Sequence, residues 1–456
     1  MRMNQFRLLT FLGLTLCSAL PAAAKPNIIA IMADDMGFEC MSSNGRTSYQ
    51  TPHLDRLAKG GIRFTHAHSQ PICTPSRVQL MTGIYNNRNY LKFGFLDPAS
   101  TTFAQLMKKA GYATCIAGKW QLEGGLQGPT NLGFDEYCLW QLTRRPSRYS
   151  NPGLEVNGKL KDYRKGEYGP DLVSDFICDF IERKKDAPFF VYYPMILPHW
   201  PFEPTPDSPD YDKAAKGGKG QAQPKYFKDM VSYTDKIVGK IDAKLDSLGL
   251  REDTLLLFIG DNGTATSVTS QLNGKPYRGG KGSPRDNGTH VPMVASWPDT
   301  VPKGHVSSTL VDLSDWLPTI CELGGAKVPK QLGLRGVSFA PLLKGDTEFK
   351  GRDHIYCWYE RNGKREKASQ HTRDRRYKLY ADEKFYDVTR DPDEKNPLPN
   401  NTLSEEVLAH YKKLKASLDA ELAITEASAA HIAARLTALK GAKRTSNKKP
   451  TKKTLK

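Results

Sequence analysis

The sequence lacks several features that would place it outside the ordinary globular proteins. After residue 24 it has no apolar run of the ~20 residues that a membrane-spanning helix requires. It has no closely spaced cysteine pair and no internal repeat, and its eight cysteines are scattered along the chain, at positions 17, 40, 73, 115, 138, 178, 321 and 357. These absences exclude a polytopic membrane protein, a cysteine zinc site and a disulfide framework, although one or two single bridges remain open.

The chain is also short of acidic residues relative to basic ones, and the imbalance is local. The formal net charge is +17 over 456 residues, of which 39% are apolar and 25% are charged. Arg2 and Arg7 lie near the start, and residues 440–456 contain seven Lys and one Arg without an acid, so +7 remains for the body. Residues 441–456 are therefore predicted to be a basic disordered tail. No base-reading motif accompanies it, so we expect no nucleic-acid partner.

The first 24 residues have the pattern of a secretory signal peptide. Arg2 and Arg7 form its basic start, residues 8–20 are mostly apolar, and residues 22–24 (AAA) offer a cleavage site. An uncleaved membrane anchor is the alternative, but the apolar run is short for one. A lipoprotein site at Cys17 is weaker, because Leu16 is not the small residue that normally precedes such a cysteine. We predict an exported protein, periplasmic or secreted, with no integral membrane segment after cleavage.

Three apolar runs indicate buried strands, at residues 27–33, 189–193 and 255–259. Each run is followed by polar residues that can do chemistry, namely Asp34 with Asp35, then His199, then Asp261 with Asn262. Continuous apolar strands that alternate with helical stretches indicate an α/β fold with both sheet faces covered. Ligands in such sheets gather beyond the carboxyl ends of the strands, so we expect these residues to meet in one crevice.

The rest of the chain predicts a long helix and a smaller C-terminal unit. Apolar residues recur at helical spacing over residues 226–248. After about residue 345 the pattern changes to short alternating strands, which predicts a small antiparallel sheet. These strands are expected at 355–359, 377–380 and 385–388. A helix then begins near Thr402, where Glu405 is placed for a capping box, and continues with a weaker pattern to Lys440.

One short segment carries the strongest functional signal. Residues 73–83 (CTPSRVQLMTG) place Cys73, Pro75 and Arg77 in a Cys-x-Pro-x-Arg pattern. This resembles the signature of the sulfatase family, whose cysteine is oxidised to an aldehyde by a formylglycine-generating system. Other motifs occur in the family's order, namely Asp34-Asp35, Gly118-Lys119-Trp120, Pro198-His199, Asp261-Asn262-Gly263, Gly279-Gly280-Lys281-Gly282, and Tyr386-Asp387-Val388 with Asp391-Pro392.

The resemblance covers roughly residues 26–400 and implies both a fold and an activity. The implied enzyme is a formylglycine-dependent, arylsulfatase-like sulfuric ester hydrolase of the alkaline phosphatase superfamily. The implied fold is a large mixed, mostly parallel sheet flanked by helices, with a smaller C-terminal antiparallel sheet. The expected organisation is a signal peptide at 1–24, a catalytic α/β domain at 25–345, a C-terminal subdomain at 346–440 and a tail at 441–456.

The resemblance also assigns roles to individual residues. Cys73, modified to formylglycine and hydrated to a geminal diol, would attack sulfur, and Arg77 would steady it beside a metal ion. Lys119 and Lys281 would hold the sulfate oxygens. His199 would bind sulfate and protonate the leaving oxygen. Cations suit this chemistry, because the oxygens of a sulfate ester otherwise repel an approaching nucleophile.

The metal ligands implied by the resemblance are Asp34, Asp35, Asp261 and Asn262. They offer only hard oxygen donors, which favour calcium or magnesium over a soft metal. Because the family usually binds calcium, we expect calcium, with magnesium as the alternative.

One position departs from the family's usual pattern. The family commonly has Gly-Lys-Trp-His, and that histidine takes a proton when the sulfated diol collapses. This chain has Gln121 there, which can hydrogen-bond the diol and contact substrate but is not a base at neutral pH. His66, His68 or a carboxylate would have to take the role, or turnover is slower, or the enzyme has specialised. His290 is expected to be structural or at the rim.

The expected substrate is a sulfated carbohydrate, and the expected protein partner is the formylglycine-generating maturation enzyme. Two alternatives remain at this point. One is a phosphate or phosphonate monoester hydrolase on the same scaffold. The other is an impaired protein that binds sulfated glycans without hydrolysing them, to which Gln121 points.

Overall fold

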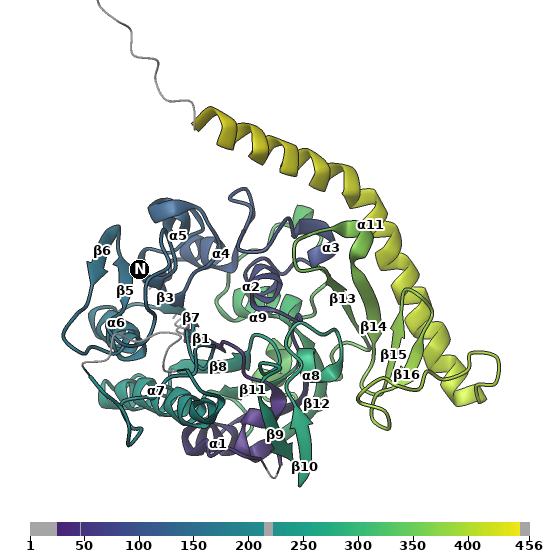
Figure 1. Ribbon diagram of the computed structural model, residues 1–456, viewed down its shortest axis with the longest axis horizontal. Helices are drawn as coiled ribbons and strands as arrows, with labels where there is room; N and C mark the ends of the chain where they lie inside the picture. The colour runs from purple at the N-terminus through teal and green to yellow at the C-terminus, as the bar shows by residue number, and fades with distance from the viewer. Residues whose placement is uncertain (1–24, 46, 214–221, 447–456) are drawn as a thin grey trace, which may run out of the picture.

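The structure is a computed structural model in which residues 25–45, 47–213 and 222–446 are described. The predicted leader at 1–24 lies outside the described residues. A ten-stranded sheet crosses the molecule between two layers of helices, and a four-stranded sheet with a long C-terminal helix packs at one side (Figure 1). This arrangement confirms the predicted fold class.

The central strands of the large sheet are parallel, and its outer strands include antiparallel ones. From one edge to the other the strands are β12 (His305–Asp312), β2 (Ile62–His68), β11 (His290–Ser296), β8 (Thr254–Gly260), β1 (Asn27–Ala33), β7 (Phe189–Pro194), β3 (Ala113–Lys119), β4 (Glu136–Trp140), β5 (Gly153–Val156) and β6 (Lys159–Asp162). From β8 to β4 all neighbours are parallel, whereas β11 is antiparallel to both of its neighbours. The carboxyl ends of β8, β1, β7 and β3 therefore lie at one edge.

The sheet separates two hydrophobic cores, as the continuous apolar strands predict. In β1, Ile28 and Met32 face one core, and Ile29 and Ile31 face the other. Three helices cover the first face, namely α2 (Cys73–Thr82), α4 (Phe103–Lys109) and α9 (Trp316–Leu323). Three others cover the second face, namely α1 (Pro52–Lys59), α6 (Gly169–Arg183) and α7 (Phe227–Ser247). The helix predicted at 226–248 corresponds to α7.

The C-terminal unit is an antiparallel sheet covered by one long helix. Its strands are β13 (Ile355–Tyr359), β14 (Ser369–Arg373), β15 (Tyr377–Tyr380) and β16 (Phe385–Asp387). The strand β14 was not predicted, because its residues (SQHTR) are polar. The helix α11 (Glu405–Ser446) begins three residues after Thr402, where the Ser404 hydroxyl accepts a hydrogen bond from the Val407 backbone N–H at 3.5 Å. It includes residues 441–446, which the sequence predicts to be tail.

Short elements complete the described chain. They are α3 (Asn86–Asn89), α5 (Gly128–Asn131), α8 (Asp286–Thr289), α10 (Ala340–Leu343), and the hairpin β9 (Thr269–Leu272) with β10 (Lys275–Arg278). The seven cysteines in the described ranges are free thiols, so none of the open disulfide pairings forms among them. Within those ranges, no helix combines the length and the apolar character that crossing a membrane requires.

Candidate functional site

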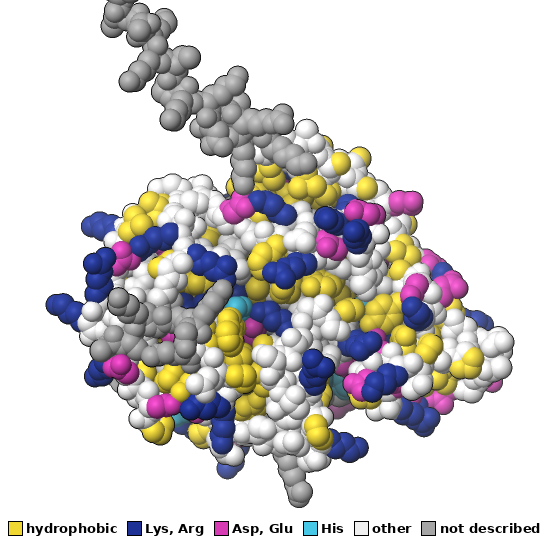
Figure 2. Space-filling view, in the orientation of Figure 1, with side chains coloured by type: hydrophobic (Ala, Val, Ile, Leu, Met, Phe, Trp, Pro, Cys, Tyr) yellow, Lys and Arg dark blue, Asp and Glu magenta, His cyan; other side chains and the backbone are white. Residues whose placement is uncertain are grey.

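The predicted polar residues meet at the carboxyl edge of the central strands. Asp34 and Asp35 follow β1, and Asp261 and Asn262 follow β8. Lys119 is the last residue of β3, His199 follows β7, and Cys73 is the first residue of α2. Lys281 lies in the loop between β10 and α8. In the view of Figure 2, a histidine side chain is visible near the centre of the face with Lys and Arg side chains close by.

Asp34 lies at the centre of the buried charges. The Lys119 ammonium donates to both of its carboxylate oxygens, at 2.9 and 2.7 Å. Arg77 is 1% exposed, and its guanidinium lies 3.9 Å from Asp34 and 3.6 Å from Asp261. Arg77 also donates to the Lys119 carbonyl at 2.8 Å. These contacts hold two cations and two carboxylates together inside the protein.

Asp35 is held in an unusual backbone conformation. Its φ of 68° lies in the left-handed region, which costs a non-glycine residue free energy and persists only where neighbours impose it. The Asp35 backbone N–H donates to the Asp261 carboxylate at 3.0 Å. Its own carboxylate accepts from the Asn262 amide at 2.9 Å and from the Lys281 ammonium at 2.6 Å. The neighbouring carboxylates of Asp34 and Asp35 therefore bond different lysines, Lys119 and Lys281 respectively.

The charges set the protonation of the three carboxylates. Burial alone would raise each pKa, because it penalises the charged form. The pKa of Asp34 is nevertheless held well below its ordinary value by Lys119 and Arg77, and Lys281 lowers that of Asp35. The pKa of Asp261 is raised well above its ordinary value by burial and by the Asp34 carboxylate, against Arg77. Asp34 and Asp35 each accept from a lysine ammonium, whereas the cation beside Asp261 is the Arg77 guanidinium at 3.6 Å.

The same residues leave two buried oxygens without a hydrogen-bond partner among the described residues, namely Asp261 Oδ2 and Asn262 Oδ1. Ligand atoms of Asp34, Asp35 and His199 lie within 4.8 Å of one another, and so do those of Asp34, Cys73 and Asp261. Unpaired carboxylate and amide oxygens in a small space are the donors that Ca²⁺ and Mg²⁺ take. The donor atoms of the four predicted ligands are therefore of the kind that suits a hard divalent cation.

Cys73 is presented to this cluster by the start of α2. All ten residues of α2 are buried, and Pro75 in its first turn sacrifices no intrahelical hydrogen bond. Cys73 is 2% exposed, and its thiol lies 3.5 Å from the Gln121 amide oxygen. The N-terminal end of a helix carries a partial positive charge, so its direction suits an anion. The predicted partnership of Cys73 and Gln121 is present as a contact.

Arg148 belongs to the site, although the sequence did not point to it. It is 6% exposed, its guanidinium stacks over the Trp140 ring at 3.8 Å, and it lies 4.0 Å from Asp34. Its guanidinium is also 3.0 Å from His199 Nδ1. In sequence it is one of three arginines within five residues, a pattern typical of an exposed loop, so only the structure identifies it.

Two contacts of His199 favour opposite tautomers of its ring. Both Arg148 and the Trp200 carbonyl lie within hydrogen-bond distance of Nδ1, at 3.0 and 2.5 Å. A guanidinium only donates and a carbonyl only accepts, so Nδ1 can satisfy one of them. A bond from Arg148 requires the proton on Nε2, which lies 3.7 Å from Asp35, and a bond to the Trp200 carbonyl requires it on Nδ1. Burial lowers the pKa of His199 to about 3 despite the Asp35 and Asp34 carboxylates, so the imidazole is neutral.

The two histidines considered as substitute bases form a different cluster. His68 stacks on His290 with ring centroids 4.9 Å apart, and His66 lies 6.2 Å from the same ring. Their charged neighbours include Arg373 of β14, and burial lowers the pKa of His66 to about 4. His290 itself stacks on Phe38, in agreement with its predicted structural role. The structure does not bring these rings to Cys73.

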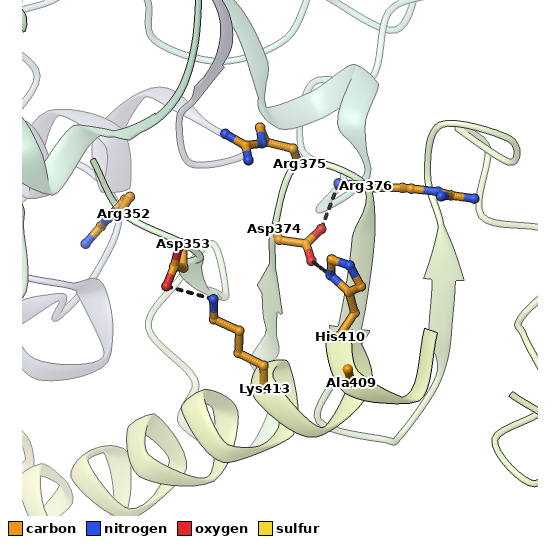
Figure 3. Close-up of a pocket in the computed structure, with 8 residues that line it drawn as sticks. All are labelled: Arg352, Asp353, Asp374, Arg375, Arg376, Ala409, His410 and Lys413. Carbon is orange, nitrogen blue, oxygen red and sulfur yellow. Dashed lines mark hydrogen bonds and ion pairs between the residues drawn. The ribbon is translucent and has the colours of Figure 1, made fainter. Parts of the chain in front are cut away.

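A cavity of about 300 Å³ lies apart from these residues, between the C-terminal sheet and α11 (Figure 3). Asp353 pairs with Lys413 at 2.7 Å, and Asp374 pairs with His410 at 2.6 Å. Arg375 lines the same cavity and is exposed. Because most of its charges pair with one another, this cavity does not resemble the convergent cluster around Asp34.

Comparison with known proteins gives the family. Residues 26–326 match the family described as Sulfatase, and residues 284–421 match the one described as N-sulphoglucosamine sulphohydrolase, C-terminal. The chain is 33% identical to arylsulfatase A of Bos taurus in an alignment of length 370 that covers 73% of this chain and 71% of the relative. It is 32% identical to the N-acetylgalactosamine-6-O-sulfatase of Bacteroides thetaiotaomicron in an alignment of length 413 that covers 73% of this chain and 78% of the relative.

Solved structures agree with these sequence matches. The crystal structure of Ps i-CgsB superposes with a TM-score of 0.71 and 26% identity, covering 87% of this chain and 92% of that one. The phosphonate monoester hydrolase of Agrobacterium radiobacter shares the fold, with a TM-score of 0.65 and 20% identity over 87% of this chain and 96% of its own. The Sulfatase match spans more than half of the chain and contains the residues gathered at the strand ends. The chain therefore belongs to the sulfatase family and is a sulfuric ester hydrolase.

Proposed function

We propose that this sulfatase is exported and removes sulfate from a sulfated carbohydrate, using a formylglycine made from Cys73 and a bound calcium ion. The observation that carries the proposal is the convergence of Cys73, three carboxylates and four cations at one sheet edge. A carbohydrate substrate is supported by the N-acetylgalactosamine-6-O-sulfatase relative. It is further supported by Ps i-CgsB, which is 27% identical and was solved in complex with k-i-k-neocarrahexaose. The leader at 1–24 supports export.

Calcium would be held by Asp34, Asp35, Asp261 and Asn262, with magnesium as the alternative, and would supply positive charge that polarises the sulfate oxygens. The neighbouring cations are Arg77, Lys119, Arg148 and Lys281. Four cations and a divalent ion outweigh three carboxylates, so the site would attract an anion. The buried surroundings strengthen that attraction relative to water.

The chain's own residues would orient the ester. Lys119 and Lys281 now donate to Asp34 and Asp35, and each ammonium has further N–H groups for sulfate oxygens. Cys73, once converted to the aldehyde by a maturation enzyme and hydrated, would supply the attacking hydroxyl. Arg77 donates to the carbonyl of Lys119 at the end of β3, which links α2 to that strand. This fixed geometry holds the nucleophile in line with the leaving oxygen.

His199 would handle the proton on the leaving side. The Arg148 contact favours the tautomer with hydrogen on Nε2, and Nε2 faces the acidic cluster. A developing alkoxide beside Nε2–H would be stabilised by that hydrogen bond as the bond to sulfur breaks, and complete transfer of the proton would start from the imidazolium form, in which both ring nitrogens carry hydrogen.

A panel of defined sulfated oligosaccharides tests the proposal directly. Protein co-expressed with a formylglycine-generating system should show the intact mass of the aldehyde at Cys73 and should release sulfate from at least one sugar. Matched aryl sulfate and aryl phosphate substrates test the reaction class, with sulfate expected to be preferred. Turnover of aryl sulfate with no desulfation across the panel would contradict the carbohydrate assignment.

Chelation is expected to remove activity and to lower the melting temperature. An ion that binds only the folded state stabilises it by RT ln(1 + [L]/Kd), about 2.7 kcal/mol at a hundredfold excess over Kd. Calcium should restore both properties, and in Asp261→Asn it should restore neither. Metal analysis provides the check: active purified protein without a stoichiometric divalent ion would rule the ion out. Asp374→Asn, in the other cavity, serves as the matched control.

Gln121→His is expected to speed the release of sulfate. The reaction gives a proton to the departing alcohol, and a second group must take a proton before sulfate leaves. A positioned general base typically contributes 10²–10⁴ in rate, and Gln121 is not a base. With a highly activated aryl sulfate, the wild type should therefore show a burst of phenol followed by slow turnover, and the variant should show a smaller contrast.

A wild type without a burst, together with no gain in Gln121→His, would show that another group already takes this proton. The variants His66→Ala and His68→Ala would then be expected to leave turnover unchanged, since both rings contact His290 instead of Cys73.

A further inference from the structure

A cavity of about 550 Å³ opens beside Gln121, and we refer to it as the Gln121 cavity. It is lined by residues that include Phe93, Gly94, Gln121, Gln141, Arg144 and Arg145. Its volume lies within the range of roughly 300–1,000 Å³ that is usual for small-ligand sites. The Gln121 amide oxygen in its wall is 3.5 Å from the Cys73 thiol. A molecule in this cavity would therefore adjoin the reacting centre.

The backbone builds one wall of the cavity from two neighbouring strands. Beyond β3 and β4 the chains stay paired, because the Gln121 N–H donates to the Gln141 carbonyl at 3.2 Å. Both glutamines then turn through left-handed conformations, with φ of 54° and 61°. Such conformations cost non-glycine residues free energy, so the surrounding structure holds the backbone of both glutamines in place. Gln141 Oε1 is buried and has no hydrogen-bond partner in the described part of the chain.

The two arginines of the cavity differ in their electrostatic state. Arg144 is neutralised, since its guanidinium lies 2.6 Å from Asp162 and 3.4 Å from the buried Glu155. Arg145 is exposed, and its guanidinium has no ion pair or hydrogen bond with any residue of the described ranges. Phe93 is half-buried, and the Arg361 guanidinium lies 4.9 Å from its ring centroid. Glu123 also lines the cavity, where it pairs with Lys92. The cavity thus combines an aromatic ring, two glutamines, a paired carboxylate and an exposed arginine.

We propose that the Gln121 cavity binds the sugar that carries or adjoins the reacting sulfate, and that Arg145 pairs with a second anionic group on it, a sulfate or a carboxylate. This inference rests on the proposed carbohydrate substrate. Sugar hydroxyls require both donors and acceptors, which Gln121 and Gln141 supply, and aromatic rings pack against the C–H faces of a pyranose. The planar guanidinium matches the geometry of an oxyanion. Arg145 would then select doubly anionic substrates over singly anionic ones.

The test compares disaccharides that carry the reacting sulfate alone, with a second sulfate, or with a carboxylate. The measured quantity is the ratio of kcat/KM for a doubly anionic substrate to that for the singly anionic one. In Arg145→Ala this ratio should fall about tenfold, through KM, because the contact is made equally before and during the reaction. Arg145→Lys should recover part of it. If the kcat/KM ratio falls in Arg145→Ala for the disulfated substrate, the second group is a sulfate. If it falls for the substrate that carries a carboxylate, the second group is a carboxylate.

Arg375→Ala is the matched control, because it removes one exposed charge from the cavity of Figure 3. It should leave the ratio unchanged. An unchanged ratio in Arg145→Ala, or an equal fall in the control, would overturn the role of Arg145 while leaving the carbohydrate substrate intact. If the wild type desulfates no sugar on the panel, both proposals fall.

Discussion

Cys73→Ala is expected to lower kcat/KM for every sulfate ester by a factor on the order of 10⁴ or more, because loss of a nucleophile removes the reaction path itself. The fold should persist. The thiol is buried at the first position of α2, and within the described part of the chain its one hydrogen-bond contact is with Gln121 at 3.5 Å. Initial rates with an aryl sulfate and a sulfated sugar measure the loss, and thermal unfolding checks the structure.

The matched control is Cys321→Ala. Cys321 is a fully buried free cysteine in α9, so its replacement removes the same atoms without touching the cluster. It should keep wild-type activity. Cys73→Ser should be as inactive as Cys73→Ala, since serine is not oxidised by the route that modifies cysteine. Activity within tenfold of wild type in Cys73→Ala would end the formylglycine mechanism.

The sequence predicts those parts of the fold whose residues show a recognisable pattern within a short stretch of the chain. Strands β1, β7 and β8 are buried on both faces, so their apolar residues are consecutive and visible. The strand β14 and the hairpin of β5 and β6 are polar or partly exposed, and their strand character comes from pairing with neighbours. Such pairing depends on residues far away in sequence, and no local pattern records it.

The candidate site divides in the same way. Asp34 and Asp261 were predicted because each follows an apolar strand within a recognisable motif, and Lys119 because its Gly-Lys-Trp motif resembles that of the family. Arg148 was not predicted, because its role depends on the Trp140 ring beneath it and on His199 beside it. His66 and His68 were considered because they precede Cys73 in sequence, but β2 places their rings against His290. Proximity along the chain was a poor guide there.

His199→Ala is expected to lower kcat/KM for a sulfated sugar by about 10²–10⁴, the range that a positioned proton donor supplies. A sugar alcohol leaves poorly without a proton. An activated aryl leaving group needs little help, so the same variant should lose much less with an aryl sulfate. A series of aryl sulfates of rising leaving-group pKa measures this dependence, which should be steeper in the variant. His410→Ala, whose ring pairs with Asp374 beside α11, is the control.

Arg148→Ala separates positioning from sulfate binding. If Arg148 acts by keeping the proton on His199 Nε2, the single variant should also show a steeper leaving-group dependence, and the double variant should lose no more than His199→Ala alone. The alternative is that the Arg148 guanidinium holds sulfate directly. In that case the kcat/KM losses of the two single variants should multiply in the double variant, and Arg148→Ala should leave the leaving-group dependence unchanged. A His199→Ala variant with equal losses for sugar and aryl sulfates would show that His199 binds sulfate and donates no proton, because a missing donor must cost most where the leaving group is poorest.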